Sequence, residues 1–232
     1  WSVEPGENGQ TDVAGLRITA GPPFLGHVGQ VYAAVFSPDG ESIASAGYDK
    51  RVLLWNPNEV ESFDFDALMS EEEGRRPAFS AFDGHTAGVR SVSFSKDGKL
   101  LLTGSYDNTV RVWDVATRTM LKTLRGHAGR VWSCEFAPDG DSVLSASHDH
   151  QAKLWSIAGY EEVRVFRGRV LEGHQDAILG AAFSPDGSRI VTASRDRTAK
   201  TWDFATGKEI REFKEGHDFL ASTAIFFADG RR

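Results

Sequence analysis

A Gly-His dipeptide recurs five times along the 232 residues of this chain, and its spacing is the feature that most constrains the fold. The five histidines are His27, His85, His127, His174 and His217, which lie 58, 42, 47 and 43 residues apart in turn. About ten residues after each one, an aromatic residue precedes a tight-turn sequence, most often Pro-Asp-Gly. Proline presets the backbone for such a turn, and glycine adopts the positive φ that it requires. A unit that recurs at this period is one supersecondary element packed against its own copies.

The residues around these turns have the alternating polarity of short antiparallel strands. Val89 to Phe94 precedes one turn, and Leu100 to Gly104 follows it. A third run ends in tryptophan in each of four repeats: Val52 to Trp55, Val110 to Trp113, Ala152 to Trp155 and Ala199 to Trp202. A fourth run, such as Met120 to Leu124 or Glu209 to Phe213, leads to the next Gly-His. Four short strands in about 42 residues predict an all-β chain built of four-stranded antiparallel blades.

Two of the tryptophans are followed by aspartate, in Trp113-Asp114 and Trp202-Asp203. Together with the Gly-His and turn spacings, these dipeptides resemble the WD40 repeat family, and the resemblance covers nearly the whole chain. It implies a WD40-type β-propeller of about four full repeats with partial repeats at both ends. The near-uniform repeats also resemble those of bacterial multidomain proteins, some of which join a protein kinase to WD40 blades.

The repeat pattern predicts a single propeller segment over residues 1–232. Its repeats span approximately 14–55, 77–113, 119–155 and 162–202, with a partial repeat at 209–232, the end of a preceding repeat at 1–13 and an acidic loop insertion at 56–76. Trp1 matches the end of a third strand, so both ends of the chain look like cuts through blades. Because a closed ring of about seven blades needs roughly 300 residues, we expect this chain to be a segment of a larger or incompletely resolved polypeptide.

The resemblance also implies a buried polar set in each repeat, made of the Gly-His histidine, a Ser or Thr on the second strand, the turn Asp and the Trp. The hydroxyl residue lies four positions before the Asp, and the Trp lies six positions after it. The four sets are His27, Ser45, Asp49 and Trp55; His85, Thr103, Asp107 and Trp113; His127, Ser145, Asp149 and Trp155; and His174, Thr192, Asp196 and Trp202. The indole N–H can donate to the hydroxyl, the hydroxyl to one imidazole nitrogen, and the other imidazole nitrogen to the carboxylate. A His, Ser and Asp together also make a hydrolase triad, but their repetition under a Trp predicts structural sets and no catalytic residue.

Members of the family commonly bind ligands on the face formed by two kinds of loop, those joining the fourth strand to the first and the second strand to the third. Carried over to this chain, the candidate protein-binding positions are Tyr48, Tyr106, His148 and Arg195, before the turn Asp, and Tyr32, Arg90, Trp132 and Leu179, just inside the first strand. The set is rich in Tyr, Trp and Arg, which dominate interface energetics. Trp132 and Arg90 are the strongest candidates, because Trp is costly to expose and Arg both stacks and forms bidentate hydrogen bonds. The alternative is that several of them only pack against neighbouring blades or coat the central channel.

The charge balance limits the partners that the chain can bind. A formal charge of −7 and a pI near 5.5 favour a basic ligand over nucleic acid, whose phosphates are bound by clustered Lys and Arg. The single cysteine, Cys134, cannot form an internal disulfide, which permits a reducing, cytoplasmic location. No stretch approaches the roughly 20 apolar residues of a membrane helix, so no membrane span is expected in this segment. We expect protein or peptide partners and leave the oligomeric state open.

The connection from Asn56 to about Arg76 accounts for the long first spacing between histidines. It carries the acids Glu59, Glu61, Asp64, Asp66, Glu71, Glu72 and Glu73, with Phe63, Phe65, Leu68 and Met69 among them. It forms either a short amphipathic segment that docks a basic partner or a solvated, mobile loop.

The sequence predicts neither a metal nor a cofactor. His148-Asp149-His150 has the residue types of a metal site, but Asp149 already belongs to a buried set and adjacent residues point in different directions. Asp64 and Asp66 lack the Gly and the terminal Glu of a calcium loop, and no Gly-rich phosphate-binding motif occurs.

These observations favour a non-catalytic scaffold that presents its loop faces to protein partners. The alternative is a regulatory or substrate-docking region of a larger enzyme, such as a WD40-containing protein kinase. Kinase motifs are absent from these 232 residues.

Overall fold

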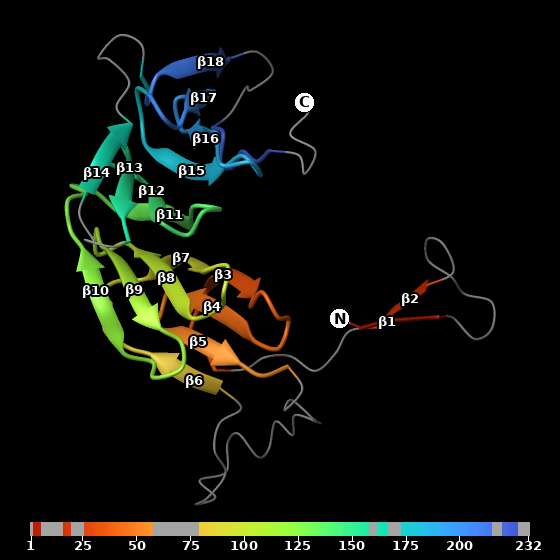
Figure 1. Cartoon of the computed structure of the whole chain (residues 1–232). Coiled ribbons are helices and arrows are strands. Elements are labelled where there is room, and N and C mark those ends of the chain that lie inside the picture. The colour runs from red at the N-terminus through yellow and green to blue at the C-terminus, as the bar shows by residue number, and fades with distance from the viewer. Residues whose placement is uncertain are drawn as a thin grey trace, which may run out of the picture.

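The computed structural model describes residues 2–5, 16–19, 26–57, 79–157, 162–166, 173–214 and 220–226. Every regular element among them is a strand, which confirms the all-β expectation (Figure 1). None of the described residues belongs to a helix long and apolar enough to cross a membrane. Strands β1 (Ser2–Pro5) and β2 (Leu16–Thr19) pair with each other in an antiparallel two-stranded sheet.

The remaining strands form four sheets of four strands, in each of which consecutive strands pair antiparallel. The first blade contains β3 (Val31–Phe36), β4 (Ile43–Gly47), β5 (Val52–Trp55) and β6 (Phe79–Phe82). The second contains β7 (Val89–Phe94), β8 (Leu100–Ser105), β9 (Val110–Asp114) and β10 (Met120–Leu124). The third contains β11 (Val131–Phe136), β12 (Ser142–Ser147), β13 (Ala152–Ser156) and β14 (Glu162–Phe166), and the fourth contains β15 (Ile178–Phe183), β16 (Arg189–Ser194), β17 (Ala199–Asp203) and β18 (Glu209–Phe213).

The turn after each first strand is stabilised by local side chains, as the Pro-Asp-Gly sequences predict. In the fourth blade the hydroxyl of Ser184 donates to Asp186 over 2.6 Å and accepts from the backbone N–H of Arg189 over 2.9 Å. Gly187 supplies the positive φ of 70° that closes the turn. Hydrogen bonds from the hydroxyl of Ser184 and from the backbone N–H and hydroxyl of Ser188 lower the pKa of Asp186 to about 2.

The second turn of each blade needs a positive φ at a residue that is not glycine. The residue after the turn Asp is Lys50, Asn108, His150 or Arg197, with φ between 66° and 71°. A left-handed backbone at a side-chain-bearing residue costs free energy, which the hydrogen bonds of the preceding Asp offset.

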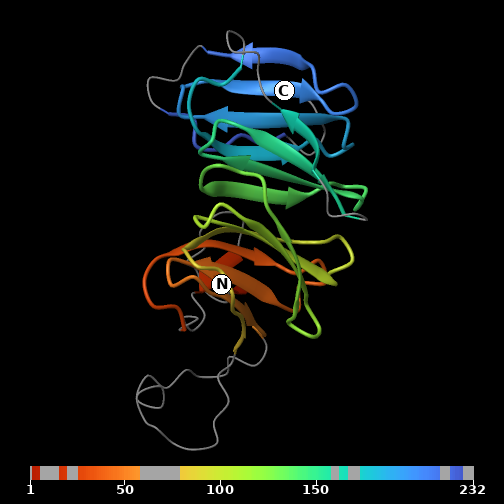
Figure 2. The ribbon, with the colours of Figure 1, turned by 90° about the vertical axis from the view of Figure 1, so that its left-hand side faces the viewer.

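The hydrophobic core is divided into three layers, each between two neighbouring blades. Between the second and third blades, Leu102 and Val112 pack with Val131, Cys134 and Trp155. Equivalent clusters lie between the first and second blades and between the third and fourth. The inner strands β3, β7, β11 and β15 follow one another along the arc, and Figure 2 shows the blades stacked in chain order. The strands run across that view, so their loops gather along its two sides.

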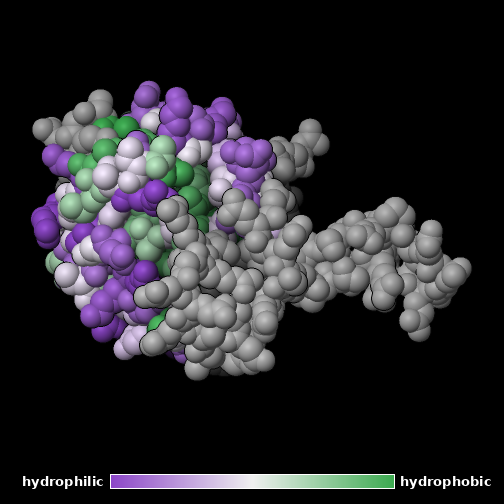
Figure 3. Space-filling view, turned by 90° about the horizontal axis from the view of Figure 1, so that it is seen from below, coloured by the Kyte–Doolittle hydropathy of each residue, from purple (hydrophilic) through white to green (hydrophobic). Residues whose placement is uncertain are grey.

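The first blade has one face that no other blade covers among the described residues. Val31 is 52% exposed, whereas its counterparts Val89 and Val131 are fully buried against the blade before them. Phe36 is 66% exposed, although Phe136 occupies the same position in β11 and is buried. Figure 3 views the molecule from this end, where apolar surface is visible beside polar side chains.

Residues 220–226 run beside the inner strand of the fourth blade. The backbone N–H of Ala221 donates to the carbonyl of Ser194 over 3.0 Å. A Cβ atom on Gly180 would lie 3.2 Å from the carbonyl oxygen of Ser222, so glycine permits this close approach. The segment therefore begins to cover the fourth blade as each blade covers the one before it.

Candidate protein-binding face

Each blade contains the four-residue polar set that its spacing implies, and the second blade shows the geometry. Thr103 Oγ1 lies 2.9 Å from the indole Nε1 of Trp113 and 2.7 Å from Nε2 of His85. Nδ1 of His85 lies 2.8 Å from Oδ2 of Asp107. With Nδ1 protonated, the indole donates to the hydroxyl, the hydroxyl to Nε2 and the imidazole to the carboxylate, which satisfies every group.

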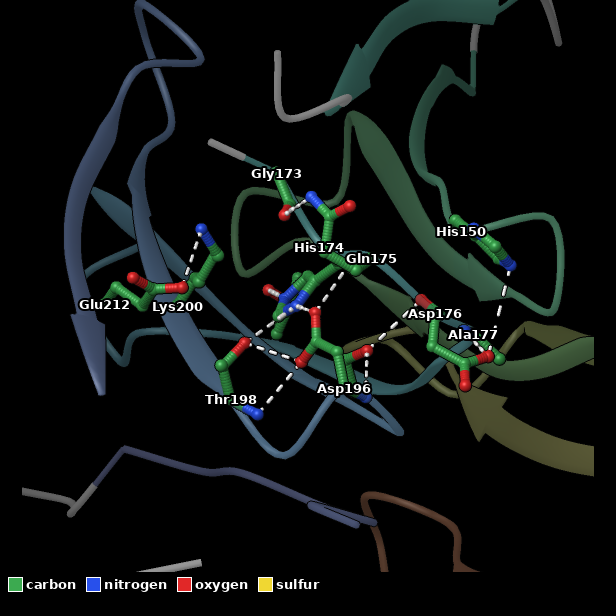
Figure 4. A network of polar contacts seen from close by, with 12 residues as sticks. His150, Gly173, His174, Gln175, Asp176, Ala177, Asp196, Thr198, Lys200 and Glu212 are labelled. Carbon is green, nitrogen blue, oxygen red and sulfur yellow. Dashed lines mark hydrogen bonds and ion pairs between the residues drawn. The ribbon is translucent and has the colours of Figure 1, made fainter. Parts of the chain in front are cut away.

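The other three sets repeat this arrangement with hydrogen bonds of 2.7 to 2.9 Å. They are His27, Ser45, Asp49 and Trp55; His127, Ser145, Asp149 and Trp155; and His174, Thr192, Asp196 and Trp202. Figure 4 shows His174 and Asp196 of the fourth set, where the hydroxyl of Thr198 adds a 2.6 Å hydrogen bond to Asp196. The same view shows Lys200, buried and 3.2 Å from Glu212.

In the second set, burial and hydrogen bonding together determine which groups are charged. Burial alone would raise the pKa of Asp107, but hydrogen bonds from His85 and Thr109 hold that pKa well below its usual value. Burial lowers the pKa of His85 more than Asp107 raises it, so the imidazole stays neutral at pH 7. The hydroxyl of Thr103, which bridges His85 and Trp113, is fully buried and inaccessible to a substrate.

His148, Asp149 and His150 do not converge on a common point. Asp149 lies 2.8 Å from Nδ1 of His127, and Nε2 of His150 instead lies 4.0 Å from Asp176. Among the described residues, no group of three His, Cys, Asp or Glu side chains is placed to hold a metal ion.

The two kinds of loop that the sequence singles out lie together in every blade. The residue before the turn Asp donates its backbone N–H to a carbonyl of the loop before the first strand; examples are Tyr106 to Gly88 over 2.9 Å and His148 to Arg130 over 2.9 Å. We call the surface made by these loops the loop face. It comprises residues 26–30, 83–88, 125–130 and 173–177 before the first strands, and the turns 48–51, 106–109, 148–151 and 195–198.

Four of the candidate residues form one aromatic and arginine cluster beside the loop face. The guanidinium carbon of Arg90 lies 5.3 Å from the ring centre of Tyr32 and 5.5 Å from that of Trp132. The ring of Tyr106 lies 5.3 Å from that of Trp132 and 5.8 Å from that of Tyr32. These four side chains come from three consecutive blades, so the cluster links the blades and presents Tyr and Arg together.

Trp132 also contains an unsatisfied polar group. Its indole Nε1 is buried without a hydrogen-bond partner. A buried donor without an acceptor costs about 1 to 3 kcal/mol, so such groups are rare in native proteins.

A family model for the WD domain, G-beta repeat, matches residues 22–56, 77–114, 118–156 and 166–203, which together make up more than half of the chain. The chain belongs to the WD40 repeat family. Each matched segment contains the Trp of one polar set and ends within one residue after it. The four matched repeats agree with the four sheets of this WD40 chain.

Curated relatives align with about half of the WD40 chain. The U5 small nuclear ribonucleoprotein 40 kDa protein of Homo sapiens is 30% identical over 162 residues, which cover 52% of this chain and 45% of that protein. A component of chromatin assembly factor 1 from Mus musculus is 33% identical over 121 residues, 50% of this chain and 20% of that protein. WD repeat-containing protein 1 of Xenopus tropicalis is 35% identical over 109 residues, 44% of this chain and 16% of that protein. The alignments thus span less than half of each relative, and these animal proteins give no support to the expected bacterial type of array.

The remaining candidate residues also lie on or beside the loop face, but they are not part of the aromatic cluster. Tyr48, His148 and Arg195 are exposed at their turns, and Leu179 is half-buried in β15. Tyr48 contacts the second blade, because a Cβ atom on Gly88 would lie 3.4 Å from the Cα of Tyr48.

Sequence reasoning missed a cation that contacts the cluster, Arg130. Its guanidinium carbon lies 5.1 Å from the ring centre of Tyr106, and its side chain is exposed. It stands immediately before β11, where the other blades have Gln30, Gly88 and Ala177. A comparison of this loop position across the four repeats would have revealed Arg130, because it is the only cation among the four residues. The acids and apolar residues of the predicted insertion at 56–76, from Glu59 to Glu73, lie outside the described residues.

Proposed function

We propose that this WD40 chain is a non-catalytic scaffold that binds protein or peptide partners on its loop face. The observation that supports this most is the cluster of Tyr32, Arg90, Tyr106 and Trp132, since Tyr, Trp and Arg dominate the hot spots of protein interfaces. Two relatives are named for multicomponent assemblies, a chromatin assembly factor and a small nuclear ribonucleoprotein. The candidate contacts outside the cluster are Tyr48, His148, Leu179 and Arg195.

The test is affinity capture with the double variant Arg90→Ala, Trp132→Ala. We expect it to lose the partners that the wild-type chain retains, with a melting temperature close to that of the wild type. The matched control is Leu121→Ala, Ile210→Ala, which removes exposed side chains from the outer strands β10 and β18. Retention of the same partners by the loop-face variant would remove this face from the proposal.

A milder variant separates the ring of Trp132 from its N–H. Trp132→Phe keeps an aromatic surface beside Arg90 and removes the unsatisfied donor. Under the proposed role, this variant binds the captured partners and is at least as stable as the wild type, because no buried donor remains unpaired.

We also propose an architecture and a cellular compartment for the chain. Residues 1–232 form a single propeller segment with the repeat boundaries given above, and the chain acts in a reducing compartment; the names of two relatives refer to chromatin and to a nuclear particle. Mass spectrometry of the intact native polypeptide distinguishes a free-standing scaffold from a docking region within a larger enzyme.

A further inference from the structure

The loop face differs in accessible charge from the chain as a whole, which carries −7. Its loops contain six cations, Lys50, Arg51, Arg125, Arg130, Arg195 and Arg197, and six acids, Asp49, Asp83, Asp107, Asp149, Asp176 and Asp196. Four of those acids belong to the polar sets, where their side chains are only 7% to 8% exposed and are hydrogen-bonded to histidine. Asp83 pairs with Arg51 at 3.1 Å, which removes one acid and one cation together, and Asp176 lies 4.0 Å from His150. The cations that remain, Lys50, Arg125, Arg130, Arg195 and Arg197, are exposed, so the charged side chains that a partner can contact on this face are mainly cations.

The most central cation is already held in a fixed orientation. Arg90 is flanked by the rings of Tyr32 and Trp132, and its Nη1 lies 3.4 Å from the carbonyl oxygen of Tyr32. Arg130 lies over the ring of Tyr106 in the same cluster. A cation whose orientation is fixed before binding loses less conformational entropy when an anion arrives. The aromatic rings around it supply apolar contact area for the same ligand.

The cations are spread along the arc, with at least one from each blade. Lys50 lies in the first blade, Arg90 in the second, Arg130 in the third and Arg195 in the fourth. A single phosphoryl group is bound by cations that converge on one point, whereas an extended peptide carries carboxylates at intervals that several blades can meet. A long nucleic acid is disfavoured because its closely spaced phosphates are bound by clustered Lys and Arg, whereas these four cations lie on successive blades.

We propose that the loop face recognises an acidic peptide segment, whose carboxylates pair with Arg90, Arg130 and Arg195 and whose apolar groups contact Tyr32 and Tyr106. This inference rests on the proposed scaffold function and specifies the chemistry of its partner. It reverses the preference for a basic ligand that the overall composition suggests, because the exposed charged side chains on this face are mainly cations although the chain as a whole is acidic.

The test is selection of random phage-displayed peptides on three immobilised proteins: the wild-type chain, Arg130→Glu with Arg195→Glu, and Arg90→Ala with Trp132→Ala. Peptides selected on the wild type are expected to be enriched in Asp and Glu. One selected peptide, labelled with fluorescein, should bind at least about tenfold more weakly to the Glu variant, and more weakly still at high salt. Arg130→Lys with Arg195→Lys should retain most of the affinity. Equal melting temperatures would show that the variants are folded.

The outcomes separate the two proposals. Enrichment of neutral or basic peptides that the Arg90→Ala, Trp132→Ala variant fails to bind would overturn the acidic preference and leave the scaffold face intact. Peptides that bind this variant as well as the wild type, or no enrichment at all, would overturn both. Tighter binding of a labelled oligouridine than of the acidic peptide would assign the face to single-stranded RNA and also overturn the inference.

Discussion

Thr103 is the bridge of its polar set, since one hydroxyl serves the indole of Trp113 and the imidazole of His85. We expect Thr103→Val to destabilise the chain by about 2 to 5 kcal/mol, because it leaves a buried N–H and a buried nitrogen unpaired at nearly constant volume. Urea unfolding measures the change. Thr86→Val is the control, because Thr86 is exposed and contributes only its backbone N–H to Asp107. A loss no larger than that of the control would show that the set contributes little to stability.

At this scale, sequence spacing predicts some contacts and not others. The set of His85, Thr103, Asp107 and Trp113 lies within one repeat, so its fixed offsets are visible in a single sequence. The meeting of Tyr32, Arg90 and Trp132 depends on how three blades pack, and no offset within a repeat encodes that geometry. The sequence could not show that the indole N–H of Trp132 lacks a hydrogen-bond partner, because this too depends on how the blades pack.

Among the elements, the inner strand β11 carries an unusual residue. Glu135 occupies the position of Val35, Ser93 and Ala182 in the other inner strands. Burial raises its pKa to about 7, although the backbone N–H of Phe183 in the next blade favours the carboxylate. The strand therefore holds an acid whose charge changes near neutral pH at the junction of two blades.

This titration makes the stability of the chain depend on pH. Because the pKa of Glu135 is higher in the folded state, its stabilising contribution is complete below its usual value of 4.5 and is lost as pH rises through about 7. Glu135→Gln should thus match the wild type near pH 4 and exceed it near pH 8 by up to about 3 kcal/mol. Urea unfolding at both values tests this, with Glu41→Gln on an exposed turn as the control. A constant difference between wild type and Glu135→Gln across the range would contradict the expectation.

Of all the features of the structure, the strands were the most predictable from the sequence. The third run Val52 to Trp55 and the fourth run Met120 to Leu124 coincide with β5 and β10, because alternating polarity and turn chemistry act locally. The sequence predicts no separate strand in the range 1–13, whereas β1 begins at Ser2 and pairs with β2. The alternating pattern was too short there to reveal a strand.

At the scale of the whole molecule, the face of the first blade that no other described blade covers favours association between copies of the chain. Val31 and Phe36 present apolar surface, whereas the corresponding Val131 and Phe136 of β11 are buried. We expect the isolated 232-residue chain to associate as its concentration rises, and Phe36→Glu to reduce that association. Sedimentation velocity measures it, and Leu121→Glu is the control, since Leu121 is exposed on an outer strand. A wild-type chain that stays monomeric at every concentration would refute this expectation.

The layered core has a consequence for how the molecule loses its structure. Each apolar layer belongs to one pair of adjacent blades, so every blade is coupled directly only to its neighbours. Stability in such an array is approximately a sum of the stabilities of the units and of nearest-neighbour terms, as in a one-dimensional Ising chain. Among the described blades, the second and third are each held by two such terms, whereas the first and fourth are each held by one. Thermal opening is therefore expected to start at the outer blades and to reach the central pair last.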